Sequence, residues 1–229
     1  MTTSPTSPRR KLVREELLSK AAEVFERQGF AQTRIEDIAS ALDLKRSALY
    51  YYFKTKNDVL RALVEDFCEI KAQEHEQSLI GHTGTASDKL RTLLAISIRT
   101  RTEGGSRVRA LDTVWTEMPE DIRAMFDNAR RRILALHIAV IKDGMESGEF
   151  RQVDPRLAAL AVLGIVNWTS WWYAPNGRDT IEALQDQLVS VAINGLVRNG
   201  GTAASVRSQG EIIASMEQDL ATLKRLTKA

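Results

Sequence analysis

The spacing of the apolar residues is the feature that most constrains the fold of this 229-residue chain. Between Arg9 and Arg27 these residues recur at intervals of three and four positions, which places them on one face of an α-helix. The same spacing returns in the long segments that follow. Five prolines occur, and none interrupts a segment of this kind, although proline inside a helix removes a backbone hydrogen bond. The sequence therefore predicts an all-α protein.

Apolar spacing and turn residues divide the chain into predicted helices. Gly29 suits the end of the first helix, Thr33 is a candidate cap for the second, and Asp43 lies in a tight turn before the third. Gly144 and Gly148 both suit the end of the long helix. The inward face of the fourth helix is predicted to comprise Val59, Leu60, Leu63, Val64, Phe67 and Ile70. The predicted ranges are 9–27, 35–42, 45–53, 59–77, 87–102, 107–115, 120–146, 155–173 and 179–197, followed by a C-terminal amphipathic helix within 201–229.

Composition argues against several classes of protein. No apolar run reaches the roughly 18 residues of a membrane-spanning helix, and residues 1–10 lack the apolar stretch of a secretory signal. We therefore expect a cytoplasmic protein. Cys68 is the single cysteine, and the three histidines, 75, 82 and 137, share no metal-ligand spacing with it or with one another. Because glycine-rich phosphate loops are also absent, the sequence indicates neither an enzyme nor a bound metal or cofactor.

The net charge of +2 is unevenly distributed along the chain. Residues 1–56 carry 11 basic and 7 acidic side chains, a net charge of +4, so the remainder carries −2. A basic N-terminal quarter on a mildly acidic body indicates that only this end meets a polyanion.

The stretch KRSALYYYF, residues 45–53, presents polar groups that suit duplex DNA. On a helix advancing about 100° per residue, Leu49 and Phe53 face inward. The outward groups are a guanidinium, a hydroxyl, a methyl and a phenol, from Arg46, Ser47, Ala48 and Tyr51. Such groups match the base edges and phosphates of DNA. Two short helices joined by a tight turn, the second with this face, form a helix-turn-helix.

The run GFAQTRIEDIASALDLKRSALYYYFKTKNDVL strongly resembles the N-terminal domain of TetR-type transcriptional regulators. The resemblance extends from about Arg9 to Phe67. Two residues depart from the pattern of that family. The usual turn glycine is Asp43, which adopts the left-handed conformation at some cost, and the usual small hydroxyl before the recognition helix is Lys45, which adds a cation.

This resemblance implies specific contacts with DNA. Thr33, Tyr50 and Lys56 would hold phosphates, with Lys56 aided by the positive start of the following helix. Arg46 would read a guanine and Ala48 a thymine methyl. The complete set of expected DNA-contacting residues is Thr33, Arg34, Lys45, Arg46, Ser47, Ala48, Tyr50, Tyr51 and Lys56.

The remaining chain is expected to bind a ligand and to form a homodimer. We predict a flexible tail over 1–8, the helix-turn-helix domain over 9–56 and a larger helical ligand-binding and dimerisation domain over 57–200. The helices over 155–173 and 179–197 are more apolar than one buried stripe requires. Gly164 and Gly195 lie inside their patterns, where glycine costs about 1 kcal/mol relative to alanine. Close packing in a dimer interface would explain both glycines; ordinary core packing is the alternative.

The stretch NWTSWWYAPNG, residues 167–177, contains three of the four tryptophans. Aromatic groups of this size line either a core or a pocket. The stretch resembles a segment of those TetR-type repressors that respond to acyl-CoA or related thioesters, which implies that Asn167, Trp168 and Trp171 face the ligand. Trp115 and Phe126 either complete an apolar cavity or belong to the core. The basic run at 130–132 either meets a CoA phosphate or forms a solvated face.

The sequence thus predicts a repressor that binds palindromic operator DNA as a homodimer and is released by a small-molecule effector, with a CoA thioester as the favoured class. One alternative keeps the DNA role and exchanges the effector for a hydrophobic drug or toxin, as in efflux regulators. A second alternative is a helical interaction protein without a DNA function.

Overall fold

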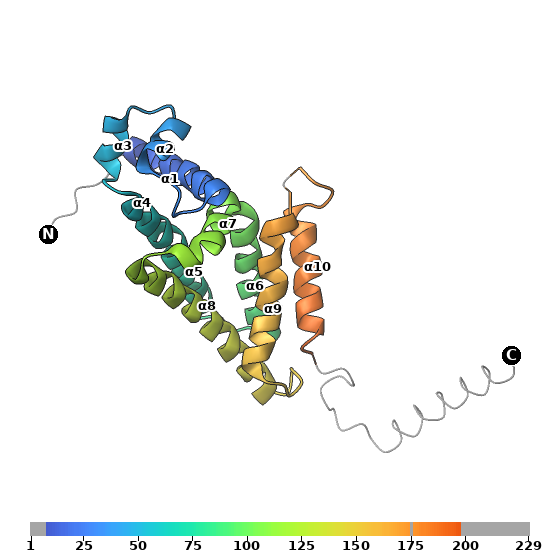
Figure 1. The fold of residues 1–229 in the computed structure, drawn as a ribbon. Helices are drawn as coiled ribbons and strands as arrows, with labels where there is room; N and C mark the ends of the chain where they lie inside the picture. Colours follow the sequence, from blue (N-terminus) through green and yellow to red (C-terminus); the bar gives the residue numbers. More distant parts are fainter. Residues whose placement is uncertain (1–7, 175, 198–229) are drawn as a thin grey trace, which may run out of the picture.

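Helices make up almost all of the computed structural model, which describes residues 8–174 and 176–197 (Figure 1). Within these ranges no strand forms, and a single antiparallel β-bridge joins Phe150 to Val197. The all-α prediction is confirmed. In chain order the elements are α1 (Pro8–Gln28), α2 (Ile35–Ala41), α3 (Arg46–Tyr52), α4 (Lys56–Leu63), a π-helical segment (Val64–Glu69), α5 (Ile70–Leu79), α6 (Ala86–Glu103), α7 (Gly105–Val114), a 3-10 turn (Trp115–Glu117), α8 (Glu120–Glu146), α9 (Pro155–Trp172) and α10 (Ile181–Asn194).

Side-chain caps set the start of α4. The Thr55 hydroxyl accepts a hydrogen bond from the Asp58 backbone N–H at 3.1 Å, and the Asp58 carboxylate accepts from the Thr55 N–H at 2.9 Å. This reciprocal arrangement fixes the first turn, so the helix begins at Lys56. The sequence analysis had placed its start later, after residue 58.

Thr33 does not cap α2, so that prediction was wrong. The residue before α2 is Arg34, whose backbone N–H donates to the Asp37 carboxylate at 2.7 Å. The Thr33 side chain is buried, and its hydroxyl donates to the Gly29 carbonyl at 2.6 Å. Thr33 therefore stabilises the loop that ends α1 at Gly29, whose φ is +79°.

The predicted inward face of the fourth helix fails at its end. Val59, Leu60, Leu63 and Val64 are buried, but Ile70 is 53% exposed. The π-helical segment between them makes wider turns than an α-helix, so it shifts the phase of every later residue. A strict 3.6-residue period cannot anticipate that shift.

Gly144 lies inside α8 instead of ending it, which corrects one of the two glycine predictions. A Cβ built at Gly144 would approach the Phe150 ring to 2.2 Å, so glycine is needed for Phe150 to pack against the helix. The Phe150 side chain is fully buried, and its backbone N–H donates to the Gly144 carbonyl at 2.8 Å. Gly148, with φ +78°, stands in the turn just after α8, as expected.

Two hydrophobic clusters organise the molecule. The first joins α1 to α4 with α7 and the beginning of α8, and the second joins α6, the end of α8, α9 and α10. Figure 1 shows the first four helices at one end and α9 beside α10 at the other, with α7 between α1 and α9. No helix within the described ranges is long and apolar enough to cross a membrane. The predicted tail, apart from Pro8, and the predicted C-terminal helix lie outside the described residues.

Two buried histidines lie close together where α5 faces α8. The rings of His75 and His137 are 6.1 Å apart, and each Nδ1 lies within hydrogen-bonding distance of the backbone carbonyl four residues earlier. Because a carbonyl only accepts, both Nδ1 atoms carry a proton and both Nε2 atoms are acceptors. Among the residues that the structure describes, the Nε2 atom of His137 has no hydrogen-bond partner. Burial lowers the pKa of His137 to about 4 and lowers that of His75 as well.

This burial predicts a loss of stability in mild acid. The unfolded chain takes up a proton near the ordinary histidine pKa of about 6.5, whereas folded His137 does not until about pH 4. The free energy of unfolding should therefore fall by about 2 kcal/mol between pH 7 and pH 5 on account of this residue alone. Urea denaturation of the wild type and His137→Met at both pH values measures the difference. An equal pH dependence in the two proteins would contradict the assignment.

Candidate DNA interface and ligand cavity

The turn between α2 and α3 has the conformation that the helix-turn-helix prediction requires. Asp43 has φ +52°, and the Leu44 backbone N–H donates to the Ala39 carbonyl at 3.0 Å. Leu49 and Phe53 are buried beneath α3, with exposed fractions of 1% and 6%. The inward and outward sides of α3 are therefore those that the sequence predicted.

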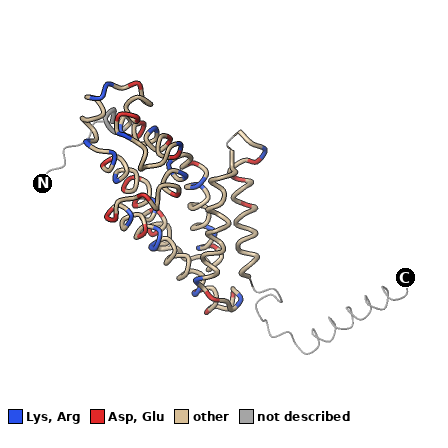
Figure 2. Tube along the Cα trace, in the orientation of Figure 1, with Lys and Arg blue, Asp and Glu red and all other residues tan. Residues whose placement is uncertain are grey.

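Five of the predicted DNA-contacting residues stand together on the outer side of α3, which we call the α3 face. Its members, all exposed, are Lys45, Arg46, Ser47, Tyr50 and Tyr51. Ala48 is half-buried beside them, and Arg34 is exposed just before α2. The Lys45 side chain makes no capping hydrogen bond to α3. Figure 2 shows that basic residues near this end of the molecule have acidic neighbours.

Arg46 is held by an acidic partner that the sequence analysis missed. Its guanidinium forms an ion pair with Glu36 of α2 and a 3.2 Å hydrogen bond to the Tyr50 hydroxyl. The Tyr50 hydroxyl in turn donates to the Glu36 carboxylate at 3.3 Å. The Tyr50 hydroxyl and the Glu36 carboxylate both raise the pKa of Arg46. Glu36 and Arg46 come together only through the turn between their helices, so no sequence spacing signals the pair.

Thr33 and Lys56 are directed into the protein rather than toward the α3 face. The Lys56 ammonium donates to the carbonyls of Phe30 and Ala31 at 2.7 and 3.0 Å, and it lies 4.6 Å from the centre of the Phe30 ring. Thr33 is 1% exposed. Both residues therefore fix the loop between α1 and α2.

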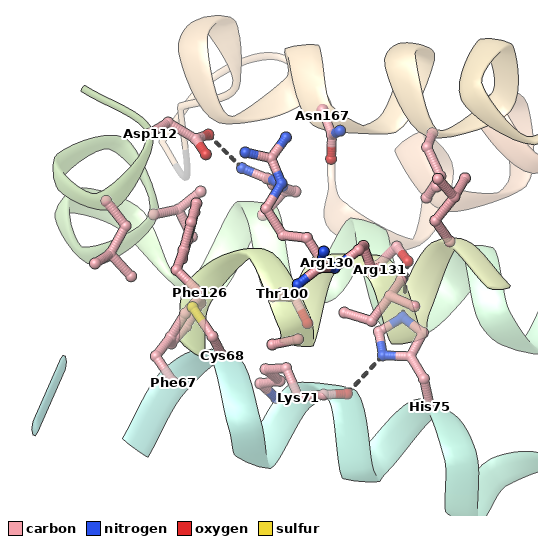
Figure 3. A pocket seen from close by; sticks show the side chains of 18 of the residues that line it. Phe67, Cys68, Lys71, His75, Thr100, Asp112, Phe126, Arg130, Arg131 and Asn167 are labelled. Carbon is pink, nitrogen blue, oxygen red and sulfur yellow. Dashed lines mark hydrogen bonds and ion pairs between the residues drawn. The ribbon is translucent and has the colours of Figure 1, made fainter. Parts of the chain in front are cut away.

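A cavity of about 410 Å³ lies among α5, α6, α7, α8 and α9 (Figure 3). The exposed residues of its lining belong to α8 and α9 and are Arg130, Arg131, Leu160 and Gly164. The opening of the cavity, which we call the mouth, therefore lies between these two helices. The apolar lining comprises Phe67, Val108, Leu111, Phe126, Ala129, Ile133, Leu134, Leu160 and Leu163. A volume of this size is typical of pockets for small organic ligands.

Polar groups interrupt the apolar lining at defined places. Arg101 of α6 pairs with Asp112 of α7 at 2.5 Å. Four residues before Arg101 in α6, the Ser97 hydroxyl lies 2.8 Å from Nε2 of His75. Figure 3 shows Asn167 pointing from α9 toward the cavity. The sequence analysis missed the polar residues of α6, although their spacing of three and four within an apolar stripe was visible.

The cavity brings together only part of the predicted ligand set. Phe126 and Asn167 line it, whereas Trp115, Trp168 and Trp171 do not, and the last two are 64% and 52% exposed on α9. Successive helical residues differ in direction by about 100°, so Asn167 faces inward while its neighbour Trp168 faces outward. Trp115 lies in the 3-10 turn and its indole N–H donates to Asp127 at 2.9 Å.

Side chains of the cavity domain also hold the helices that carry α3. Arg109 of α7 donates to Glu26 of α1 at 2.6 Å and to the Ser170 carbonyl of α9 at 3.4 Å. The Glu117 carboxylate accepts from the Ala31 backbone N–H at 2.6 Å. The helix-turn-helix is thus attached to the cavity wall by apolar packing and by directional bonds.

A helix-turn-helix mounted on a cavity-bearing helical domain defines the class of transcriptional regulators that contain both a DNA-reading unit and a ligand domain. Matches to models of known protein families identify the family within that class. Residues 17–63 match the model for bacterial regulatory proteins of the tetR family, and residues 83–196 match the tetracyclin repressor-like C-terminal domain. The chain therefore belongs to the TetR family of transcriptional regulators, as its N-terminal sequence predicted.

Curated relatives and a solved structure are similar over most of the chain. The transcriptional repressor KstR2 of Mycolicibacterium smegmatis is 24% identical over 193 residues, covering 82% of this chain and 92% of the relative. The fatty acid metabolism regulator protein of Bacillus subtilis is 22% identical over 185 residues, covering 79% and 94%. AibR, solved with isovaleryl coenzyme A and operator DNA, shares the fold with a TM-score of 0.62 and 23% identity, over 78% and 96% of the two chains.

From its position on the α3 face, we expect Arg46 to discriminate between DNA sequences. Replacing Arg46 by alanine should weaken binding to operator DNA from the protein's own upstream region by about tenfold, the cost of one bidentate base contact. Binding to a scrambled duplex should change much less. Arg91→Ala, an exposed residue of α6, removes the same charge and serves as the control. Fluorescence anisotropy measures the affinities of the wild type and of both variants for the two duplexes, and equal losses from Arg46→Ala on both duplexes would show that Arg46 contacts only phosphate.

Proposed function

We propose that this TetR-family protein is a repressor that binds a palindromic operator as a homodimer and releases it when a CoA thioester occupies the cavity. The observation that carries the proposal is the cavity itself, apolar within and basic at its mouth. Its wall also belongs to the hydrophobic cluster that supports α3. The effector-bound form and the DNA-bound form would therefore be two conformations of one packed unit.

The α3 face is proposed to enter the major groove. Arg46 would leave Glu36 for a guanine edge, because a bidentate contact with a base replaces the hydrogen bonds it makes in the free protein. Ser47, Ala48 and Tyr51 would meet neighbouring bases, and Tyr50 and Lys45 the phosphates. Arg34 would contact a phosphate near the start of α2. Thr33 and Lys56 are buried or internally bonded, so their role is to hold the loop between α1 and α2.

The cavity suits an acyl group joined to a large anionic carrier. The interior accommodates an apolar chain, whereas the nucleotide part of CoA is too large to enter with it and would remain outside the mouth. There Arg130 and Arg131 are exposed and can meet its phosphates. Arg132 is committed to ion pairs with Glu69 and Glu76 of the π segment and α5. The structure of AibR, which has a similar fold, contains isovaleryl coenzyme A and supports the proposal.

The partner-facing surface is proposed to be the outer side of α9 and α10. Figure 2 shows few charged residues along these helices. Apolar side chains exposed there include Leu157, Ile165, Trp168, Trp172 and Val191. A continuous exposed apolar face is typical of a protein interface. A Cβ at Gly164 would meet nothing within 4 Å in this chain, so core packing does not explain this glycine, which borders the mouth. We accordingly assign Asn167 and Phe126 to the effector and Trp168 to the dimer.

Coupling between the two sites is proposed to pass through residues that belong to both. Leu111 and Phe126 line the cavity and also pack in the cluster beneath α1 to α4. An effector that displaces them would move α7, which Arg109 ties to α1. In a dimer, a small rotation of each α1 changes the separation of the two α3 helices, so the spacing no longer matches successive major grooves.

The proposal predicts release of the operator by a thioester but not by its free acid. Octanoyl-CoA should displace upstream-region DNA in an anisotropy titration, and octanoic acid at the same concentration should not. Arg130→Ala combined with Arg131→Ala should raise the half-release concentration about tenfold, because two charge-assisted contacts are lost. Arg91→Ala is again the charge control. Release by octanoic acid, or by a neutral hydrophobic drug instead of any thioester, would refute the thioester proposal.

A further inference from the structure

Thr100 is a buried hydroxyl without a partner in the wall of the cavity. It lies on α6, and its Oγ1 atom is buried without a hydrogen bond to any of the described residues. Threonine inside a helix usually donates to a backbone carbonyl of the preceding turn. Thr92, Thr102 and Thr113 do so here, at 3.1, 3.0 and 2.8 Å. Thr100 therefore departs from the behaviour of its neighbours at the point where α6 meets the cavity (Figure 3).

Ser97 and Arg101, the other polar residues of the α6 wall, already have hydrogen-bond partners. Nδ1 of His75 donates to the Lys71 carbonyl at 2.7 Å, so its Nε2 atom is an acceptor. The Ser97 hydroxyl must then donate its single proton to that Nε2 atom, 2.8 Å away. Arg101 of the same helix is paired with Asp112. Thr100 thus presents the uncommitted O–H donor of the α6 wall.

An uncommitted buried donor favours a ligand that supplies an acceptor. A plain alkyl chain against Thr100 would leave the hydroxyl without a partner, which is unfavourable in an apolar site. A ketone oxygen accepts a hydrogen bond without requiring another donor, and a hydroxyl oxygen can accept in the same way. Thr100 lies on α6, which packs against both α8 and α9, so the α6 wall faces the mouth between those two helices from across the cavity. The acceptor is therefore required within the apolar part of the ligand.

We propose that the effector carries a keto or hydroxyl oxygen within its acyl group and that Thr100 recognises this oxygen. The inference rests on the proposed function, because it names the class of acyl group that the same cavity takes. Thr100 is a specificity-determining residue in this account. It separates oxygenated acyl groups from plain alkyl chains of equal length.

Isothermal titration calorimetry on the full-length protein tests the proposal. The probes are octanoyl-CoA and its 3-oxo, 5-oxo and 7-oxo derivatives, which place one carbonyl at successive depths. At least one oxo derivative should bind about five- to tenfold more tightly than octanoyl-CoA, the gain of one satisfied hydrogen bond. Equal affinity for all four probes would overturn the proposal, because Thr100 would then gain nothing from a carbonyl oxygen in the acyl chain.

Variants at position 100 separate recognition from packing. Thr100→Val preserves the shape and removes the donor, so the preference for the oxo probe should disappear: the oxo probe loses its hydrogen bond, and octanoyl-CoA no longer leaves a donor unpaired. Thr100→Ser restores the donor and should restore the preference. Thr102→Val is the matched control, because the Thr102 hydroxyl bonds to the Ile98 and Arg99 carbonyls of its own helix. An unchanged preference in Thr100→Val would also overturn the proposal.

Probes without CoA keep this test independent of the proposed function. The pair 2-decanone and 2-methyl-1-decene differs only in the exchange of a carbonyl oxygen for a methylene carbon. If no thioester binds, the CoA proposal fails, yet a preference for the ketone that Thr100→Val abolishes would still support recognition by Thr100. Equal binding of the ketone and the alkene to the wild type would refute it. Thermal melting of each variant confirms that the fold is retained.

Discussion

The packing of α7 against α1 is the interaction on which the rest of the structure depends. One hydrophobic cluster contains the helix-turn-helix residues Leu49 and Phe53 together with Leu111 of α7 and Phe126 of α8. The last two also line the cavity. Because close-packed interiors transmit displacements, this shared packing is the physical basis of the proposed coupling between the cavity and the DNA-reading helix. Arg109 adds directional bonds to α1 and α9 at the same contact.

Charge is used differently at the two sites. On the α3 face, Arg46 is paired with Glu36 at the surface, where the ion pair is weak and can be exchanged for contacts with DNA. In the cavity, Arg101 is paired with Asp112, and the other polar groups of the lining include the hydroxyls of Ser97 and Thr100, while exposed arginines stand at the mouth. Under the proposed function, this division would separate a rim that binds the carrier from an interior that distinguishes neutral ligands.

Periodicity in the sequence predicted the helices and the outward face of α3. Leu49 and Phe53 are apolar and four residues apart, so they lie on one side of a helix, and that side is buried. It failed at Ile70, where a π-helical segment shifts the phase, and at Thr33, whose hydroxyl bonds to a nearby carbonyl instead of capping α2. The aromatic run at 167–173 suggested one ligand-facing wall. Helix geometry instead directs Asn167 to the cavity and Trp168 outward, a division that residue type alone cannot signal. Thr100 was missed because its importance depends on what its neighbours already bond.

The central claim is that a ligand in the cavity changes the separation of the two recognition helices in a dimer. Lys54, exposed just after α3, can be replaced by cysteine and spin-labelled, because burial raises the pKa of Cys68 to about 12 and keeps that thiol unreactive. Electron–electron distance measurements then report the separation with and without saturating octanoyl-CoA. The account predicts a shifted distance distribution when the thioester is bound. An unchanged distribution in a protein that binds the thioester and releases DNA would contradict it.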